Sequence, residues 1–295
     1  MKINPLLSGG SAGKDYRMMK YGLLGYPLEH SISPFIHRRI FELMGLDHCE
    51  YALYEVKPDM LSHEAERIKE LQGFNVTIPY KVQIIPFLDE LDESAKRYGA
   101  VNCVKSSDSI IGYNTDVYGF LKSVELLGAS LESKILLLGC GGVGRMMAIE
   151  AAIAGAELTI AIRHDSEEEK AAGKISAEIR ELSDKGSVRI TYSDRLNITN
   201  QYDLMLNATP VGMYPNPEEM PVVSDILGKV KYVFDAVYNP SPTKLVTEAQ
   251  KRGVKAIDGI PMLVYQAALA EQIWNDIYVS EDDLAEIIKE AKWQL

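Results

Sequence analysis

The stretch that most limits how this chain can fold lies in its middle, at residues 134–145, which read KILLLGCGGVGR. Its apolar first half has the length and bulk of a strand buried on both faces of a parallel sheet. Gly139, Gly141 and Gly144 then fit the pattern G-x-G-x-x-G ahead of a helix-forming segment, 146–154. Glycines in such a turn let backbone N–H groups approach a pyrophosphate at the start of a helix. The order strand, glycine turn, helix therefore favours a dinucleotide site over an ordinary turn.

A second expected strand supports this interpretation. The helix ends near Gly155, and residues 157–162 follow as ELTIAI, which completes a β–α–β unit. Cys140 lies inside the glycine loop, where the start of a helix would lower the pKa of a thiol. We expect Cys140 to be a packing residue instead, because free cysteines mostly behave as small apolar side chains.

Composition argues against several classes of function. The length of 295 residues suits two domains, and the net charge of −11 argues against binding nucleic acid or an anionic membrane. No apolar run reaches the roughly 18 residues of a membrane span, and the N-terminus lacks the apolar core of a secretory signal. The three cysteines show no metal-ligand spacing and suit a reducing compartment. We therefore expect a cytoplasmic protein that needs no metal, nucleic acid or membrane.

The first part of the chain begins with residues 1–17, which read as an extension, and a strand expected at 21–25. Pro34 fits the first turn of a helix that runs to about residue 44, and this makes Ser33 the expected N-cap. Capping leaves Ser31 unexplained. Two hydroxyl groups one residue apart at a helix start can also hold a carboxylate, so a binding role for this pair stays open.

Strands and helices alternate after this helix. Strands are expected at 50–56, 74–78 and 100–104, with a helix at 60–71. Lys81 follows the strand at 74–78, where a lysine is most often a solvated surface charge. It gains a chemical role only if its ammonium is held beside a reacting oxygen. Ligands of open α/β sheets bind at such strand ends.

The second part of the chain continues the alternation. Strands are expected at 188–192, 232–238 and 255–257, and a strand running into a loop at 204–213; a long helix is expected at 262–278. The pattern predicts an α/β fold in two domains. Residues 1–120, completed by C-terminal helices at 257–295, would form the first α/β domain. Residues 121–256 would form a Rossmann-type, doubly wound parallel-sheet domain for the dinucleotide, with the active site in the cleft between the two.

Seven motifs follow one another along nearly the whole chain. They are GYPLEHSISPFIH at 25–37, GFNVTIPYK at 73–81, GAVN at 99–102, GYNTD at 112–116, NATPVGM at 207–213, DAVYNP at 235–240 and MLVYQA at 262–267. These motifs and their order resemble those of the shikimate dehydrogenase family. The resemblance implies reversible transfer of a hydride between a nicotinamide cofactor and the ring of shikimate, which interconverts shikimate and 3-dehydroshikimate.

The resemblance also implies roles for residues at matching positions. Lys81 and Asp116 would form the catalytic pair. The substrate would contact Ser31, Ser33, Thr77, Asn102, Asp116, Tyr238 and Gln266. The cofactor would contact Gly139, Cys140, Gly141, Gly142, Val143, Arg163, Asp165, Thr209, Ala236, Gly259 and Glu93. No metal is implied, since the cofactor carries the hydride and a side chain handles the proton.

The choice between NADP and NAD depends on the segment after the second nucleotide strand. The family usually has Asn-Arg-Thr there, followed by a second basic residue that binds the 2′-phosphate of NADP. This chain has Arg163, His164 and Asp165, followed by acidic residues at 167–169. Arg163 suits a phosphate, whereas an acid in this segment suits the ribose hydroxyls of NAD. We expect NADP as the family default, with NAD or dual use open.

Three alternatives stay open beside this interpretation. A quinate/shikimate dehydrogenase that uses NAD, or an amino-shikimate relative, would differ by its substrate. A regulator that binds shikimate without catalysis would not need the pair Lys81 and Asp116, which this chain retains. A methylene-folate dehydrogenase would not need Ser31 and Ser33. The sequence leaves both a monomer and a homodimer open.

Overall fold

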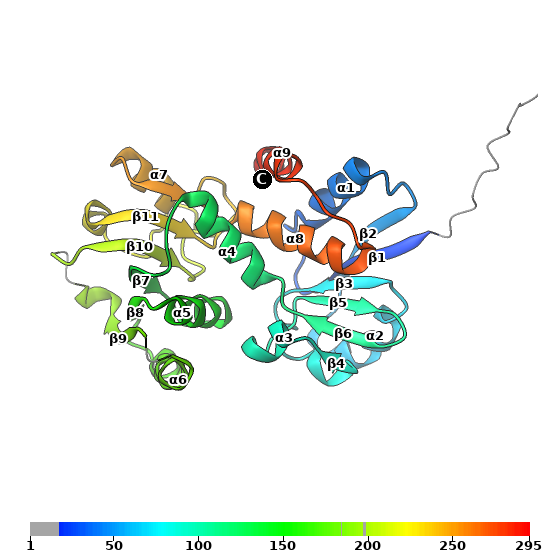
Figure 1. Cartoon of the computed structure of the whole chain (residues 1–295), viewed down its shortest axis with the longest axis horizontal. Coiled ribbons are helices and arrows are strands. Elements are labelled where there is room, and N and C mark those ends of the chain that lie inside the picture. Colours follow the sequence, from blue (N-terminus) through cyan, green and yellow to red (C-terminus); the bar gives the residue numbers. More distant parts are fainter. Residues whose placement is uncertain (1–17, 184, 197–198) are drawn as a thin grey trace, which may run out of the picture.

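The computed structural model describes residues 18–183, 185–196 and 199–295, so the expected extension at 1–17 lies outside the described residues. Within these ranges the strands form two six-stranded sheets that lie at opposite ends of the molecule (Figure 1). Helices α4 and α8 run between the two ends. The predicted α/β fold in two domains is confirmed.

The first sheet is mixed, with the strand order β2-β1-β3-β5-β6-β4. Strand β1 pairs in parallel with β2 on one side and with β3 on the other, whereas β5 runs antiparallel to both β3 and β6. Its elements are β1 (Met19–Gly25), α1 (Ser33–Met44), β2 (Cys49–Glu55), α2 (Leu61–Ile68), β3 (Gly73–Val76), β4 (Glu90–Leu91), α3 (Glu93–Tyr98), β5 (Cys103–Ser106) and β6 (Ile110–Tyr113).

The second sheet is parallel throughout, with the order β12-β11-β10-β7-β8-β9. Read from β9, this is the doubly wound order 3-2-1-4-5-6, and helices lie on both faces. Its elements are β7 (Lys134–Leu138), α5 (Gly142–Ala154), β8 (Glu157–Ile162), α6 (Ser166–Leu182), β9 (Ser187–Tyr192), β10 (Tyr202–Asn207), β11 (Val230–Asp235), α7 (Lys244–Lys251) and β12 (Lys255–Ile257). In β7 the apolar residues Ile135, Leu136 and Leu137 are completely buried, as a central strand requires.

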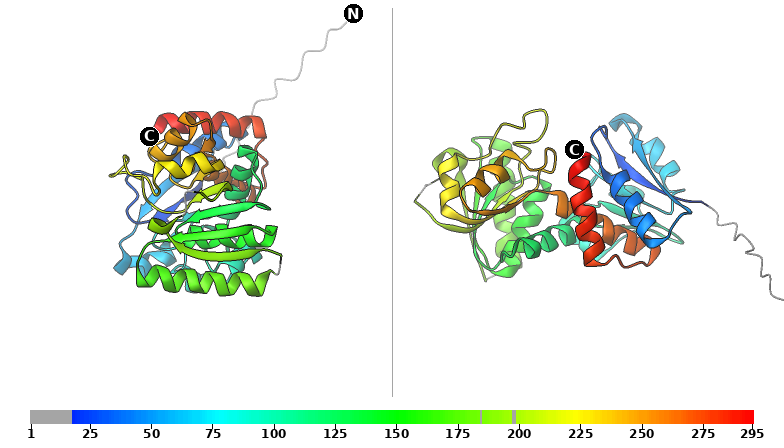
Figure 2. Two further views of the ribbon diagram at one scale, coloured as in Figure 1. Left: turned by 90° about the vertical axis from the view of Figure 1, so that its left-hand side faces the viewer. Right: turned by 90° about the horizontal axis from the view of Figure 1, so that it is seen from above.

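Three further helices complete the fold: α4 (Asp116–Leu127) and α8 (Ile260–Asn275), which connect the two halves, and α9 (Glu281–Ala291), which packs on α1 and α8. Helices α4 and α8 pack closely side by side (Figures 1 and 2). A side chain at Gly119 of α4 would place its Cβ 2.3 Å from the carbonyl oxygen of Met262, so only glycine permits this approach. Short 3₁₀ helices complete the structure at Pro58–Met60, Ile85–Phe87, Ser193–Arg195, Ser224–Lys229 and Lys292–Gln294.

The end of the chain returns to pack on its beginning. Ile36 and Ile40 of α1 share one apolar core with Val264 of α8 and Ile287 of α9, and all four side chains are fully buried. Trp274 of α8 also donates a hydrogen bond from its indole N–H to a backbone oxygen of β5 over 2.9 Å. The C-terminal helices therefore pack on the first half of the molecule, and the first turns of α8 lie where the two halves meet. Across the described ranges, no helix is long and apolar enough to cross a membrane.

Candidate active site

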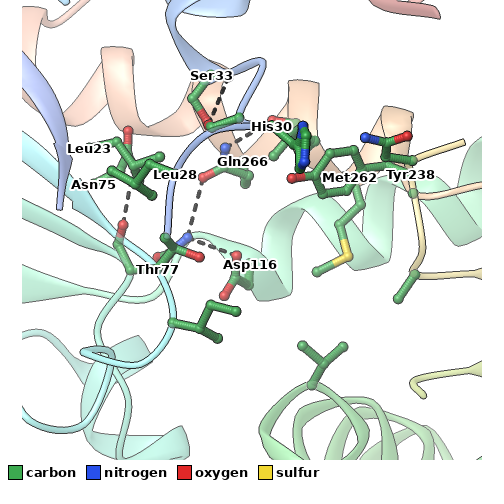
Figure 3. Close-up of a pocket in the computed structure, with 18 of the residues that line it drawn as sticks. Leu23, Leu28, His30, Ser33, Asn75, Thr77, Asp116, Tyr238, Met262 and Gln266 are labelled. Atoms are coloured by element: carbon green, nitrogen blue, oxygen red, sulfur yellow. Dashed lines mark hydrogen bonds between the residues drawn. The ribbon is translucent and has the colours of Figure 1, made fainter. Parts of the chain in front are cut away.

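A cavity of about 470 Å³ lies between the two halves of the molecule. Its wall combines residues that follow strands β1 and β3 with residues that follow β10 and β11 and with the first turns of α8. Every residue expected to contact substrate lines it: Ser31, Ser33, Thr77, Lys81, Asn102, Asp116, Tyr238 and Gln266. In Figure 3 the labelled side chains Ser33, Thr77, Asp116 and Gln266 surround one part of this space, with Tyr238 and Met262 beside it.

Lys81 and Asp116 form an ion pair in this cavity. The Nζ atom of Lys81 donates to Oδ2 of Asp116 over 2.7 Å, and the two side chains are 27% and 15% exposed. Lys81 lies in the turn after β3, and its backbone oxygen accepts the N–H of Val101 over 2.7 Å. Asp116 opens α4, where the helix dipole favours a negative charge. The turn and the helix start thus bring an ammonium and a carboxylate together at the cavity wall.

Asn102 holds Asp116 in place. Its Nδ2 atom donates to Oδ1 of Asp116 over 2.8 Å and also lies within hydrogen-bond distance of Thr115 and Gln266. Its Oδ1 atom accepts the backbone N–H of Thr115 over 2.6 Å. Asn102 is only 3% exposed, so these bonds are shielded from water and fix its orientation. One oxygen of Asp116 is therefore occupied by Asn102, and the other is left for Lys81.

The two serines sit where a helix start meets the cavity, but the predicted capping role of Ser33 is wrong. Helix α1 begins at Ser33 itself, with Ile32 as its N-cap and no side-chain capping bond. The backbone oxygen of Ile32 already accepts the N–H of Ile36 over 3.1 Å, so the first helical turn closes one residue earlier than expected. The hydroxyls of Ser31 and Ser33 consequently both remain at the cavity wall.

The remaining predicted substrate contacts come from three separate elements. Thr77 follows β3, Tyr238 follows β11, and Gln266 projects from α8, where its Nε2 atom donates to the backbone oxygen of Leu263 over 2.9 Å. That bond leaves the amide oxygen of Gln266 directed toward Asn102 and Thr115. Burial raises the pKa of the Tyr238 phenol, which keeps this group a neutral hydrogen-bonding partner.

The glycine loop has the shape that a phosphate group requires. Gly139 has a φ of +89°, and a Cβ at Gly144 would lie 2.5 Å from the carbonyl oxygen of Gly139, so neither tolerates a side chain. A Cβ at Gly141 or Gly142 would meet nothing within 4 Å, so the space beside them is open. Helix α5 has no side-chain N-cap, which leaves its first N–H groups to a ligand. The residues present therefore fit a dinucleotide.

Comparison with known proteins decides the family. Residues 23–104 match the shikimate dehydrogenase substrate binding domain. A shikimate dehydrogenase (NADP(+)) of Methanococcus maripaludis is 40% identical over 275 residues, which cover 90% of this chain and 96% of that protein. The chain belongs to the shikimate dehydrogenase family. Another NADP(+)-named relative, from Caldanaerobacter subterraneus subsp. tengcongensis, is 35% identical over 91% of this chain and 96% of its own length.

A solved family structure agrees with this assignment. The shikimate 5-dehydrogenase of Listeria monocytogenes, in complex with shikimate and NAD, superimposes with a TM-score of 0.81. It is 29% identical, and the match covers 92% of this chain and 96% of that one. Family members similar to this chain thus include proteins named for NADP(+) and one crystallised with NAD.

In the segment after β8, the one cation expected to meet the cofactor, Arg163, is already paired with a carboxylate. Arg163 is 78% exposed, yet its Nε atom donates to Oε1 of Glu168 over 2.7 Å, and its backbone N–H donates to Oε2 of the same carboxylate over 2.8 Å. Asp165 caps α6 by accepting the N–H groups of Glu167 and Glu168, and these bonds lower the pKa of its carboxyl group. Asp165 therefore acts as the N-cap of α6, as expected of an acidic run at a helix start.

The other predicted cofactor contacts are not all gathered at the cavity. Val143, Ala236 and Gly259 line it, whereas Thr209 packs over Gly139 and donates to the side chain of Asn207 over 2.7 Å. Glu93 lies outside the cavity wall; it opens α3, is 84% exposed and forms an ion pair with Lys96. The structure thus does not bring Glu93 to the cavity.

Cys140 behaves as a packing residue in the glycine loop. It is 8% exposed, and burial raises the pKa of its thiol, the opposite of the change that a free helix terminus would cause. No cluster of three or more histidine, cysteine or acidic side chains arranged for a metal occurs within the described residues.

Several cavity residues received no role from the sequence. His30, Asn75, Met213, Tyr214 and Met262 all line the wall. A usable signal existed for Asn75, because side chains two residues apart on a strand share a face, and Thr77 lies two residues after it. Tyr214 carried no such signal, since it lies in an irregular loop after β10.

Proposed function

We propose that this protein is a shikimate dehydrogenase that catalyses the reversible, NADP-linked reduction of 3-dehydroshikimate to shikimate. The observation that carries the proposal is the ion pair between Lys81 and Asp116, held by Asn102 in one cavity with two serines and Gln266. Residues up to 120 together with 257–295 form the substrate domain in this proposal, and residues 121–256 form the nucleotide domain. The family membership and the parallel second sheet support this division.

The proposed chemistry follows from the charges in the cavity. The bound nicotinamide cofactor supplies the hydride for reduction and accepts it in the reverse direction. As the ketone carbon is reduced, its oxygen develops negative charge, and the Lys81 ammonium stabilises that oxygen and gives it a proton. Asp116 orients the ammonium and accepts a hydrogen bond from the new hydroxyl. In the reverse direction the amine of Lys81 takes the hydroxyl proton.

Substrate recognition in this proposal uses neutral hydrogen-bonding groups around that pair. The hydroxyls of Ser31 and Ser33 bind the carboxylate of the substrate. Thr77, Asn102 and Gln266 bind the ring hydroxyls, and Tyr238 closes the same side of the pocket. Burial of Asn102 and Gln266 supports this role, because a buried site rejects an analogue that lacks a matching hydroxyl group.

The cofactor assignment places the phosphates at the start of α5, with NADP as the main cofactor and NAD as a second one. The open space beside Gly141 and Gly142 supports phosphate binding. Arg163 supports the 2′-phosphate of NADP, whereas its pairing with Glu168 supports tolerance of NAD. We also propose a cytoplasmic location, in keeping with the three free cysteines.

One spectrophotometric experiment tests this proposal: oxidation of shikimate and of quinate, each with NADP and with NAD. Reduction of either nucleotide in the presence of shikimate is expected, with little reduction in the presence of quinate. Faster turnover of quinate with NAD would replace the proposal by a quinate/shikimate dehydrogenase. Calorimetric binding of shikimate without turnover under any of the four conditions would replace it by a non-catalytic binding protein.

A further inference from the structure

The carboxylate of Glu168 is paired with Arg163, the cation that would otherwise be available to bind a phosphate. Glu168 accepts both the side chain and the backbone N–H of Arg163, so its two oxygens are engaged by the same residue. Its side chain is 21% exposed, whereas that of Arg163 is 78% exposed. A carboxylate that is partly buried and bonded twice is held more firmly than an ordinary surface ion pair.

The pair lies beside the glycine loop. Strand β8 runs parallel to β7, with Ala161 paired to Leu138, so Arg163 follows β8 at the sheet edge where the loop begins. The Sγ atom of the loop residue Cys140 lies 3.5 Å from the backbone oxygen of Glu168. The first turn of α6 therefore contacts the loop that would hold the dinucleotide, and Glu168 contacts both that loop and Arg163.

We propose that Glu168 is a specificity-determining residue that competes with the 2′-phosphate of the cofactor for Arg163. The inference rests on the proposed use of a nicotinamide dinucleotide. A 2′-phosphate that approaches Arg163 must displace the carboxylate or share the guanidinium with it, and in either case it gains less attraction from that cation. A 2′-hydroxyl carries no charge and loses nothing by this competition. Glu168 thereby lowers the ratio of the affinity for NADP to the affinity for NAD.

The side chains of the neighbouring acidic residues make their hydrogen bonds and ion pairs with other groups. Asp165 caps α6, and Glu167 forms an ion pair with Lys170 over 2.7 Å. Glu169 accepts a hydrogen bond from Tyr192 over 2.9 Å. Glu167 is therefore a matched control, because it carries the same charge in the same helical turn but does not touch Arg163.

The test compares Glu168→Gln and Glu167→Gln with the unaltered protein. Calorimetry would measure the binding of adenosine 2′,5′-bisphosphate and of 5′-AMP, which differ only by the 2′-phosphate. We expect Glu168→Gln to tighten binding of the bisphosphate about fivefold and to leave 5′-AMP within about twofold, the scale of one charge–charge contact near a surface. The ratio of kcat/KM for NADP to that for NAD should rise by the same factor. Glu167→Gln should leave both ratios unchanged.

A third variant tests the route of the effect. In an Arg163→Ala background, Glu168→Gln should no longer change the ratio between the two nucleotides, because the group for which the phosphate competes is gone. An unchanged ratio in Glu168→Gln, an equal change in Glu167→Gln, or an effect that persists without Arg163 would each overturn the inference. If shikimate is not oxidised but the nucleotide ratios shift as expected, the proposed function fails and the inference stands.

Discussion

Lys81 is the residue on which the proposed reaction depends most. Its ammonium lies 2.7 Å from Asp116 in the cavity, whereas surface lysines of this chain, such as Lys96, pair with carboxylates in open solvent. Both lysines donate to one acidic side chain, so the ion pair by itself does not distinguish them. Lys81 differs because its partner Asp116 is itself held by Asn102, which gives the pair one orientation relative to the pocket.

Replacing Lys81 by alanine should lower kcat for shikimate oxidation by about 100-fold or more, the usual weight of acid–base catalysis by a positioned side chain. Affinity for NADPH, measured by fluorescence titration, should change little, because the phosphates are assigned to the start of α5, whereas Lys81 lies in the turn after β3. Lys96→Ala is the control and should retain full activity. Near-native turnover of the Lys81 variant would contradict the assigned role.

Asp235 makes a second residue-level prediction, about stability. It is completely buried at the end of β11, and burial raises the pKa of its carboxyl group to about 6, although Thr243, Asn207 and a backbone N–H donate to it. A carboxyl group with a raised pKa in the folded state is disfavoured when ionised. Its contribution to stability therefore increases as pH falls through about 6 toward the value of the unfolded chain, near 4.

Asp235→Asn isolates this contribution because it removes the titration. The free energy of unfolding of the unaltered protein, relative to that of the variant, should rise by about 2.4 kcal/mol between pH 7.5 and pH 4, because the unfolded carboxyl group also begins to bind its proton near pH 4. Urea unfolding of both proteins across this range measures the difference. A difference that stays constant with pH would show that Asp235 does not titrate there.

At the level of elements, the close packing of α5 against the end of β7 depends on Gly144, although glycine is a poor helix former. Gly144→Ala should weaken NADPH binding at least about tenfold and reduce stability by about 1–3 kcal/mol, because its Cβ would lie 2.5 Å from a backbone oxygen that cannot move freely. Gly173 in α6 is the matched control, since a Cβ there meets nothing within 4 Å. Gly173→Ala should stabilise the protein by about 0.5–1 kcal/mol and leave NADPH binding unaltered.

Urea unfolding and fluorescence titration of both glycine variants distinguish the two expectations. Equal stability changes in Gly144→Ala and Gly173→Ala would mean that helix propensity alone matters at both positions. Unaltered NADPH binding by Gly144→Ala would remove the argument that the close approach at this glycine shapes the nucleotide site.

Elements were predictable where a local pattern decides them and not where a distant contact does. The buried strand β7 and the turn after it follow from residues 134–145 alone. The strand expected at 100–104 instead begins at Cys103, because the side chain of Asn102 turns into the cavity network. The helix expected to reach residue 278 ends at Asn275, where Asp276 takes a positive φ of 53°. The antiparallel placement of β5 likewise depends on its neighbours in space.

At the scale of the whole molecule, one contact spans the cavity. His30 lies in the loop after β1, and Tyr214 lies in the loop after β10; their rings meet edge to face with centroids 5.4 Å apart. Both residues line the cavity. The contact therefore links the two halves of the molecule beside the pocket, and we expect it to favour a closed arrangement of these halves around the substrate.

Tyr214→Ala should raise the apparent KM for shikimate about two- to tenfold, since an aromatic pair contributes about 0.5–1.5 kcal/mol to the closed arrangement. Affinity for NADPH should remain the same. Tyr278→Ala, at a site that is 71% exposed, is the control and should leave both values unaltered. A KM for shikimate equal to that of the unaltered protein would show that this contact does not assist closure.

The candidate site was predictable in its residues but not in its connections. Lys81, Asp116 and Gln266 belong to motifs that resemble those of the family, and the structure gathers all three at one cavity. The hydrogen bonds that Arg163 donates to Glu168 join the end of β8 to the first turn of α6, and the contact between His30 and Tyr214 joins two loops that are far apart in the sequence. Such contacts depend on side-chain conformations that no local spacing encodes.

The return of α8 to the first sheet has a consequence for synthesis. A chain that emerges from the ribosome in order exposes the complete set of strands β7 to β12 before residues 260–275 appear. The nucleotide half therefore has all of its sheet while Ile36 and Ile40 of α1 still lack the helices that cover them. The part of the pocket wall that contains Gln266 forms only after α8 has emerged, so we expect a chain that ends before Ile260 to keep the second sheet but not to bind the substrate.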